Sequence, residues 1–285
     1  MINVGISAAR NRRRGFFRTL LRSGSFLIGV LIVLFWVFCS LFGLQIVPYD
    51  PLAEDVLNAL GPPSPVHWFG TDQLGRDIFS RVIVGSRDIL TVAPLATILA
   101  TVVGTVLGLL TGYFRGIVDE IVSRLIEAKM AVPSVIVALL AIVALGTSEM
   151  TVIIVIGFSF GPVIARTIRS AVLSERELDY VAAAKLRREN SAHIMFIEIL
   201  PNILPPLLVE FTVRVGYAIF AVATLSFLGF GLQPPSPDWG LSISTNYSMI
   251  SGGYWWTVLF DATAIASLVI GVNMLAEGLQ GVLDE

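Results

Sequence analysis

Long apolar runs with few or no charges alternate with short polar segments along this chain. A membrane helix needs about 20 mostly apolar residues, and only helices or closed barrels satisfy every backbone polar group in lipid. The runs lack the two-residue alternation of a membrane barrel, so the pattern predicts six transmembrane helices. They cover residues 23–49, 89–114, 130–148, 150–165, 202–228 and 256–279.

The composition supports a membrane protein. Of the 285 residues, 55% are hydrophobic and only 14% are charged, whereas soluble domains carry roughly a quarter charged residues. Such a chain cannot cover a water-facing surface, which excludes a water-soluble enzyme, a disordered protein and a nucleic-acid binder. A single cysteine, Cys39, excludes a disulfide framework or a cysteine-rich metal site.

The basic residues predict the orientation. Residues 1–22 hold six arginines and no acidic residue, so the positive-inside rule places this end in the cytoplasm. Six alternating spans then put the basic residues of 115–129 and 166–188 on the same side. We expect a multi-pass protein of the cytoplasmic (inner or plasma) membrane with both termini cytoplasmic. The first run is too long for a cleaved signal peptide and indicates a signal anchor.

Small residues and prolines predict how the helices pack. Four glycines recur every four residues through the second run, a spacing that lets helix backbones approach closely in lipid. We expect them to serve helix packing rather than to contact a substrate: Gly104, Gly108, Gly112 and Gly116. Pro133 and Pro162 are expected to kink or end their helices.

Motifs for covalent chemistry are missing or misplaced. No phosphate-binding glycine loop precedes Lys129 or Lys185, so the chain has no P-loop ATPase of its own. Residues 157–161 match a nucleophile elbow formally, but they lie inside a predicted membrane helix rather than at a strand-to-helix turn. His67 and His193 are predicted on opposite sides of the membrane. We expect no catalytic residue, metal site or cofactor on this chain.

The segment between the fourth and fifth runs predicts two short helices. Residues 174–177 have capping-box spacing before an alanine-rich helix over 178–186. Asn190 or Ser191 can cap a second helix over 193–200, which ends at Pro201. Such a helix pair on the cytoplasmic side can seat in a partner's groove and transmit a push. The alternative is a solvated linker, but a linker would not be so helix-prone or so well capped.

Four stretches in order resemble a known family. Residues 180–202 resemble the EAA loop of binding-protein-dependent ABC importer permeases, whose pattern ends in Leu-Pro as Leu200-Pro201 does. Residues 67–77, 225–240 and 273–279 are similar to the dipeptide/oligopeptide/nickel permease family. Residues 67–77 match the second permease of its pair, the one with a short outer segment after its first span. With the matching span order, the resemblance covers nearly the whole chain.

The resemblance implies an all-α membrane protein with six transmembrane helices and the type I ABC importer transmembrane fold. It implies a basic cytoplasmic N-terminus (1–22), a first transmembrane helix with an extracytoplasmic segment (23–86), and an ABC type-1 transmembrane domain (87–285) with a cytoplasmic coupling loop (174–201). The implied partners are a homologous second permease, two ATP-binding subunits that hold ATP and Mg, and an extracytoplasmic solute-binding protein.

The implied function is import of di- or oligopeptides by alternating access. A nickel-chelate or cofactor importer permease is an alternative, and an ion-coupled secondary transporter or a membrane scaffold without a transport role is an alternative of a different class. The resemblance assigns the ATPase-coupling role to Asp179, Tyr180, Ala182, Ala183, Ala184, Lys185, Arg187, Arg188, Asn190, Leu200 and Pro201.

The coupling loop departs from the family at two positions. Ala182 stands at the glutamate position and Arg188 at the glycine position. Glycine adopts a left-handed turn without steric cost, and arginine does not. We therefore expect the turn to shift toward Asn190, which tolerates that conformation better.

Charged residues in and beside the spans are further candidates. Glu210 and Arg214 are spaced to pair along one helix, and charges in a membrane usually face a bundle interior or a water-filled cavity. They either line a translocation path for a zwitterionic peptide, form a structural pair, or contact the partner permease. Asp261, near the outer interface, is expected to be hydrated.

The outer segment after the first run, 47–88, is a candidate contact for the solute-binding protein. We expect that contact to involve Asp72, Gly75, Arg76 and Asp77. Closing the outer mouth and stabilising the permease pair are the alternatives for this segment. A helix is predicted to start near Leu74.

Overall fold

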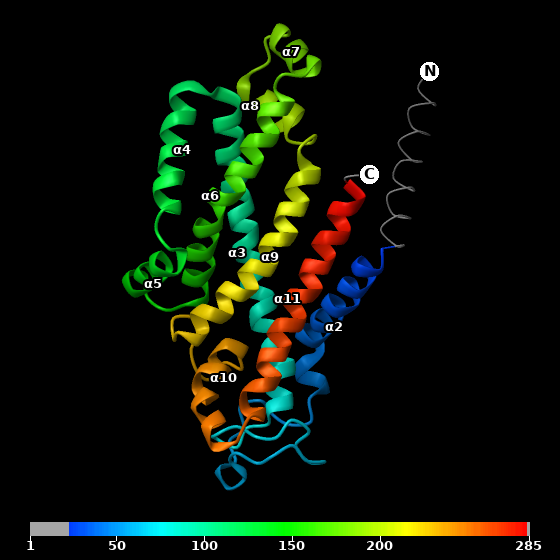
Figure 1. Ribbon diagram of the computed structural model, residues 1–285, viewed down its shortest axis with the longest axis vertical. Helices are drawn as coiled ribbons and strands as arrows, with labels where there is room; N and C mark the ends of the chain where they lie inside the picture. Colours follow the sequence, from blue (N-terminus) through cyan, green and yellow to red (C-terminus); the bar gives the residue numbers. More distant parts are fainter. Residues whose placement is uncertain (1–22, 284–285) are drawn as a thin grey trace.

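The computed structural model describes residues 23–283 and is helical, with no strand in that range (Figure 1). The basic segment 1–22 lies outside the described residues. Five helices are long and apolar enough to cross a membrane, which confirms an all-helical membrane protein. They are α2 (Gly24–Ile46), α3 (Ile78–Phe114), α6 (Glu149–Glu175), α9 (Leu204–Phe227) and α11 (Trp256–Leu283).

The central helix of the bundle is α3. It contacts α6 along much of its length and also packs against α2 and α9, while α11 packs against α2 and α9 (Figure 1). Aliphatic side chains that are fully buried, such as Ile89, Ile219 and Leu268, join these helices in one apolar core. The helix α3 starts at Ile78 rather than near Leu74 because the Asp77 carboxylate caps it.

The third predicted span is wrong as a single helix. The run 130–148 splits into the end of α4 (Gly116–Met130) and α5 (Ser134–Leu145), and the two helices meet at 89°. Pro133 stands between them, and its missing N–H prevents a continuous helix. A sixth span exists only if α4 and α5 count together as one bent crossing. Pro162, in contrast, does not end α6, which continues to Glu175.

Three of the four spaced glycines lie where α3 meets α6. A Cβ atom added to any of them would come within 2.7 Å of a side chain of α6, so a larger residue would separate the helices. The pairs are Gly104 with Ile164, Gly108 with Ile168, and Gly112 with Val172. Gly116 does not belong with them, which corrects the prediction. It opens α4 with a φ of +58°, and a Cβ added there would meet nothing within 4 Å.

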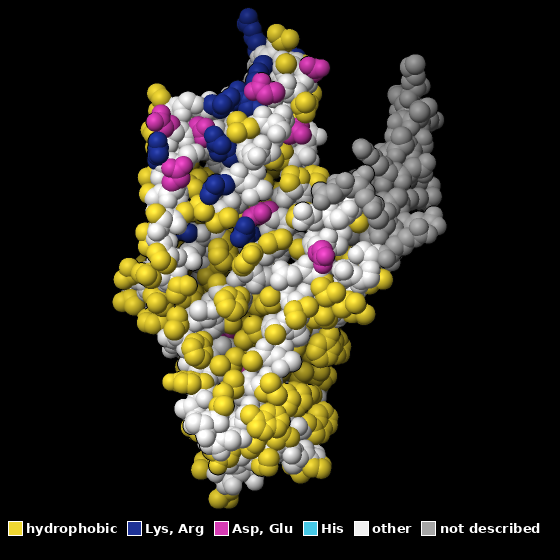
Figure 2. Space-filling view, viewed as in Figure 1, with side chains coloured by type: hydrophobic (Ala, Val, Ile, Leu, Met, Phe, Trp, Pro, Cys, Tyr) yellow, Lys and Arg dark blue, Asp and Glu magenta, His cyan; other side chains and the backbone are white. Residues whose placement is uncertain are grey.

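The two ends of the bundle differ in charge. On the face shown in Figure 2, Lys and Arg side chains gather together with Asp and Glu at one end, which we name the α7 end, and the other end shows few charged side chains. That end carries α7 (Asp179–Leu186), α8 (Ser191–His193) and η2 (Ile194–Ile199). The opposite α10 end carries η1 (Val56–Asn58), α10 (Trp239–Asn246) and η3 (Tyr247–Gly252) (Figure 1). The predicted coupling loop and outer segment therefore lie at opposite ends.

Candidate coupling loop and adjoining cavity

The start of the loop differs from the prediction. Ser174 does not cap a new helix, because it lies in the last turn of α6 and its hydroxyl donates to the Ser170 carbonyl at 3.4 Å. The helix continues past it because Ile168 and Val172 keep burying side chains against the glycines of α3. The next helix, α7, starts after Leu178, which provides no side-chain cap.

Arg188 holds the turn after α7, and the predicted shift to Asn190 is wrong. Arg188 has a left-handed φ of +58°. Its N–H donates to the Lys185 carbonyl at 3.0 Å, and the Glu189 N–H donates to the Ala184 carbonyl at 3.2 Å. This pair of bonds is the Schellman pattern of a helix C-terminus, which requires a left-handed residue whatever its side chain.

Asn190 has a different role. Its backbone is extended, and its side-chain oxygen accepts the His193 N–H at 2.6 Å, so it caps the short second helix as predicted. The strain at Arg188 costs about 1–2 kcal/mol and is outweighed by the two hydrogen bonds that end α7.

The loop is tied to the ends of two long helices. Val181 and Ala184 are buried against Ile194 and Ile199 of the same loop. The Arg176 guanidinium donates to the last carbonyls of α3, at 3.2 Å for Gly112 and 2.8 Å for Tyr113.

The Tyr180 hydroxyl donates to the Glu175 carboxylate at the end of α6 at 2.7 Å. Burial, reinforced by this carboxylate, raises the pKa of Tyr180 to about 12. The tyrosine therefore stays neutral and keeps its proton in the bond. The loop is thus bonded directly to the ends of α3 and α6.

The outer face of the loop is exposed. Ala182, Ala183 and Lys185 are exposed whereas Ala184 is buried. Pro201 is exposed and Leu200 is half-buried. The sequence analysis missed Leu186, which is 84% exposed at the tip of α7. An apolar side chain in that position suits an apolar depression on a partner.

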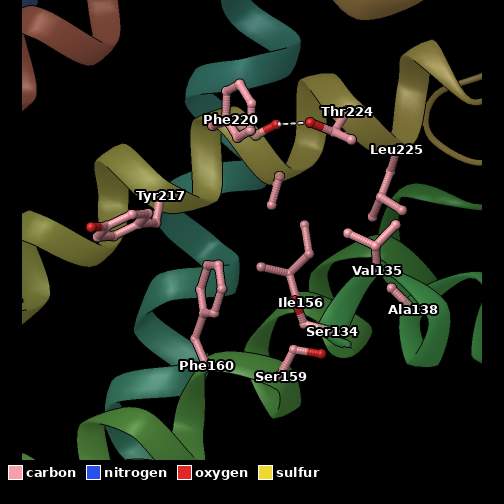
Figure 3. Close-up of a pocket in the computed structure, with 11 residues that line it drawn as sticks. Ser134, Val135, Ala138, Ile156, Ser159, Phe160, Tyr217, Phe220, Thr224 and Leu225 are labelled. Atoms are coloured by element: carbon pink, nitrogen blue, oxygen red, sulfur yellow. Dashed lines mark hydrogen bonds between the residues drawn. The ribbon is translucent and has the colours of Figure 1, made fainter. Parts of the chain in front are cut away.

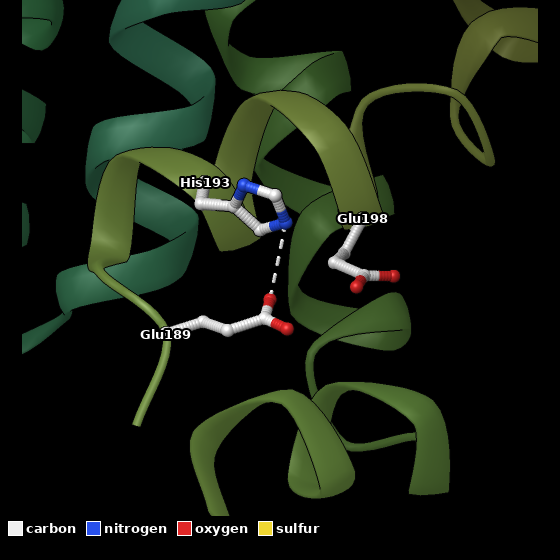
Figure 4. Close-up of side chains that lie close together, drawn as sticks. All are labelled: Glu189, His193 and Glu198. Atoms are coloured by element: carbon white, nitrogen blue, oxygen red, sulfur yellow. Dashed lines mark ion pairs between the residues drawn. The ribbon is translucent and has the colours of Figure 1, made fainter. Parts of the chain in front are cut away.

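Three side chains that could ligate a metal meet beside the loop (Figure 4). Ligand atoms of Glu189, His193 and Glu198 lie within 4.8 Å of one another, a grouping that the sequence analysis did not expect. The Arg187 guanidinium already bonds both carboxylates, with Nε 2.7 Å from Glu189 and Nη2 3.0 Å from Glu198. These bonds, chiefly the one to Glu189, raise the pKa of Arg187. Arg187 therefore neutralises the charge of the two carboxylates and links the two sides of the turn.

The charged pair of α9 forms as the spacing predicted. Arg214 Nε lies 2.6 Å from Glu210 Oε1, and both side chains are mostly buried. The guanidinium lies over the Tyr217 ring at 5.2 Å from its centroid.

Tyr217 also lines a cavity of about 240 Å³ between α5, α6 and α9 (Figure 3). Nothing in the sequence marks this cavity, since its walls come from uncharged side chains on three separate helices.

The outer candidates are buried and hold their own segment together. Asp72, Arg76 and Asp77 are all less than 10% exposed. Arg76 Nε donates to Asp72 at 2.8 Å, and Asp77 accepts the Ser80 N–H at the start of α3. Gly75 has a φ of +75°, and a Cβ there would overlap the Asp55 carbonyl. These residues shape the outer segment from within, and contact of the segment with a binding protein stays a prediction.

Asp261 is not hydrated, contrary to expectation. It is 3% exposed, and its Oδ1 has no hydrogen-bond partner among the described residues. Nearby, Asp238 is fully buried and caps α10 by accepting the Leu241 N–H at 2.8 Å. Burial raises the pKa of Asp238 to about 6. The interior of the α10 end therefore contains carboxyl groups that are buried away from the surface.

The fold defines an integral membrane permease with a loop of short helices at its α7 end. The MetNI methionine ABC transporter in inward-facing conformations has a similar fold, with a TM-score of 0.57 and 18% identity over 71% of this chain and 96% of that one. The type I ABC importer fold is thereby confirmed.

A family model described as "Binding-protein-dependent transport system inner membrane component" matches residues 104–285, and this chain belongs to that family. The dipeptide transport system permease protein DppC of Escherichia coli (strain K12) is 40% identical over 276 residues, which is 94% of this chain and 91% of the relative. DppC of Alkalihalophilus pseudofirmus is 36% identical over 271 residues, covering 95% and 89%. The relatives are permease subunits, and the expected family is confirmed.

Proposed function

We propose that this chain is the transmembrane permease subunit of an ATP-driven importer that moves di- or oligopeptides across the cytoplasmic membrane by alternating access. Relatives named as dipeptide permeases match nearly the whole chain. The observation that carries the mechanism is the loop around α7, which is exposed on one face and clamped to α3 and α6 by Arg176 and Tyr180 on the other. Neither a secondary transporter nor a solvated linker explains that clamp.

The proposal includes partners that the chain needs. A homologous second permease would complete the pathway, and an extracytoplasmic solute-binding protein would deliver the peptide. Two ATP-binding subunits would hold ATP and Mg, so no cofactor and no catalytic residue is assigned to this chain. The basic α7 end would face the cytoplasm together with both termini, as the positive-inside rule favours.

In this mechanism, closure of the ATP-binding subunits displaces α7. The buried contacts of Val181 and Ala184 and the bonds from Arg176 pass that displacement to α3 and α6. The close glycine contacts make these two helices move as one body. ATP can drive this change only if it binds the two states of the complex with different affinities. Glu210 and Arg214 lie on the pathway, where they meet the charged ends of the peptide.

Reconstitution of the complete complex in liposomes tests the proposal. We expect uptake of a radiolabelled dipeptide to require both ATP and the binding protein. Leu186→Glu should lower co-purification of the ATP-binding subunits about tenfold, because it places a charge in their docking surface. Leu57→Glu, which changes another highly exposed leucine at the α10 end, is the control and should leave co-purification unchanged. Uptake by this chain alone, driven by an ion gradient without ATP, would contradict the proposal.

A further inference from the structure

One face of α9 changes from charged to apolar along its length. Positions 210, 214, 217, 221 and 224 recur every three or four residues and therefore share that face. Glu210 and Arg214 stand at the end nearer the α7 end, and Tyr217, Ala221 and Thr224 follow as lining of the cavity. The Thr224 hydroxyl donates to the Phe220 carbonyl at 2.8 Å (Figure 3), so it is satisfied within the helix.

The cavity has the size and the lining for one apolar side chain. Its volume is about 240 Å³, whereas an apolar protein cavity of about 150 Å³ already admits benzene. Ile156 and Phe160 reach toward α9 from α6, and Val135 and Ala138 of α5 close another side (Figure 3). A phenyl or branched aliphatic group fits this space, whose walls are mostly apolar and hold no side chain of opposite charge for an ionic group.

Charged groups from two helices flank the cavity. The Arg214 guanidinium covers the Tyr217 ring, and only its Nε is hydrogen-bonded within the described residues, so its Nη groups remain for a carboxylate. From α4, Lys129 Nζ donates to the carbonyl of Ser159, another lining residue. Glu210 is the carboxylate beside Arg214. This set complements a zwitterion with both a carboxylate and an ammonium group, which a lipid acyl chain does not provide.

We infer that this cavity is a subsite for one apolar side chain of the translocated peptide, while Arg214 and Glu210 bind the charged main-chain ends. The inference rests on the proposed function and adds a specificity element inside the permease. Peptides with a large apolar side chain gain contact with the cavity, and Gly-Gly does not. Ala221 and Ala138 are the residues whose small size keeps the subsite open.

Uptake of two peptides by the complete reconstituted transporter tests the inference. Labelled Gly-Gly and Gly-Phe are supplied at concentrations that saturate the binding protein, and their ATP-driven initial rates are compared. Ala221→Phe should lower the Gly-Phe to Gly-Gly rate ratio about tenfold, because its ring fills the cavity. Ala138→Leu fills the cavity from α5 and should lower the ratio in the same direction, which covers the case in which Ala221→Phe does not fold. The control Ala266→Phe enlarges an exposed alanine of α11 and should leave the ratio unchanged.

The outcomes separate the inference from the proposed function. If the unmodified complex takes up neither peptide with ATP, the proposed function fails and the subsite fails with it. If it takes up both and the filled variants keep the original ratio, or lose both rates equally, only the subsite is refuted. A photocross-linking experiment on the unmodified complex gives a second test. If a photoreactive acyl lipid cross-links to Ala221 and a photoreactive phenylalanyl dipeptide does not, lipid occupies the cavity and the subsite is refuted.

Discussion

Replacing Gly108 by alanine tests the contact between α3 and α6 directly. The added Cβ would lie 2.7 Å from Ile168 Cβ and 2.9 Å from the Ala165 carbonyl oxygen, where ordinary contacts begin at 3.4 Å. The nearest atoms belong to the backbone or are fixed to it, so no side-chain rotation relieves the overlap. The two helices must therefore separate by about 0.7 Å, and such a gap forfeits a quarter to a half of each dispersion contact along the interface.

The expected magnitude follows from two opposing effects. Overpacking of this kind costs about 1–3 kcal/mol, and the better helix propensity of alanine returns up to about 1 kcal/mol. We expect a net loss of about 1–2 kcal/mol. Gly281 in α11 is the matched control, because its Cβ would meet nothing within 4 Å. Gly281→Ala should stabilise the protein by up to about 1 kcal/mol.

Thermal unfolding in detergent measures both variants. A loss of about 1–2 kcal/mol should lower the Tm by roughly 2–8 °C, and Gly281→Ala should raise it slightly. If Gly108→Ala raised the Tm as Gly281→Ala does, the helices would not touch at this point. The assignment of the glycine stripe to helix packing would then be refuted.

Three further predictions concern other parts of the chain. Arg188→Gly should slow amide hydrogen exchange in the loop about five-fold relative to Arg188→Ala, because glycine removes about 1 kcal/mol of left-handed backbone strain. Faster exchange in the glycine variant would contradict this prediction. The raised pKa of Asp238 means that the folded state holds its proton more tightly between about pH 4 and 6, so the free energy of unfolding falls by up to about 3 kcal/mol as the pH rises through that range. Asp238→Asn keeps the cap of α10, and the difference between its Tm at pH 5 and at pH 7.5 should be smaller than in the unmodified protein. An unchanged difference would mean that other groups cause the pH dependence. Asp119→Asn weakens the bidentate pair between Asp119 and Arg169, whose two bonds are 2.7 and 2.6 Å long. Because the pair is partly exposed, the loss of stability should not exceed about 1 kcal/mol. It should be measurable as faster proteolysis or faster hydrogen exchange in α4.

The sequence was sufficient to predict the membrane class and most of the spans, because lipid imposes long apolar helices whatever their neighbours. It was not sufficient for the third span, since an uncharged run does not show how sharply the chain bends at Pro133. The predicted capping box at Ser174 failed because tertiary packing of Val172 continues α6 through a locally favourable stop. At Arg188, likewise, the hydrogen bonds that end α7 outweigh the unfavourable left-handed conformation of an arginine.

The candidate site was predictable only where its residues are close in sequence. Glu210 and Arg214 pair along one turn of helix, so their spacing was enough. The burial of Asp261 and the cavity at Tyr217 depend on segments far apart in the chain, and no local pattern encodes them. The sequence did not reveal that Asp72 and Arg76 are buried, because their mutual bond offsets the cost of burying both charges.

The length of α6 determines how this bundle can rock. Phe160 at the cavity lies about 22 Å along the helix from Glu175, and Glu149 lies about 16 Å in the other direction. If the helix pivots beside the cavity, a displacement of about 2 Å at its Glu175 end tilts it by about 5° and moves the Glu149 end about 1.5 Å the other way. Tilting of α6 as one rigid helix would then narrow the passage at one end while widening it at the other.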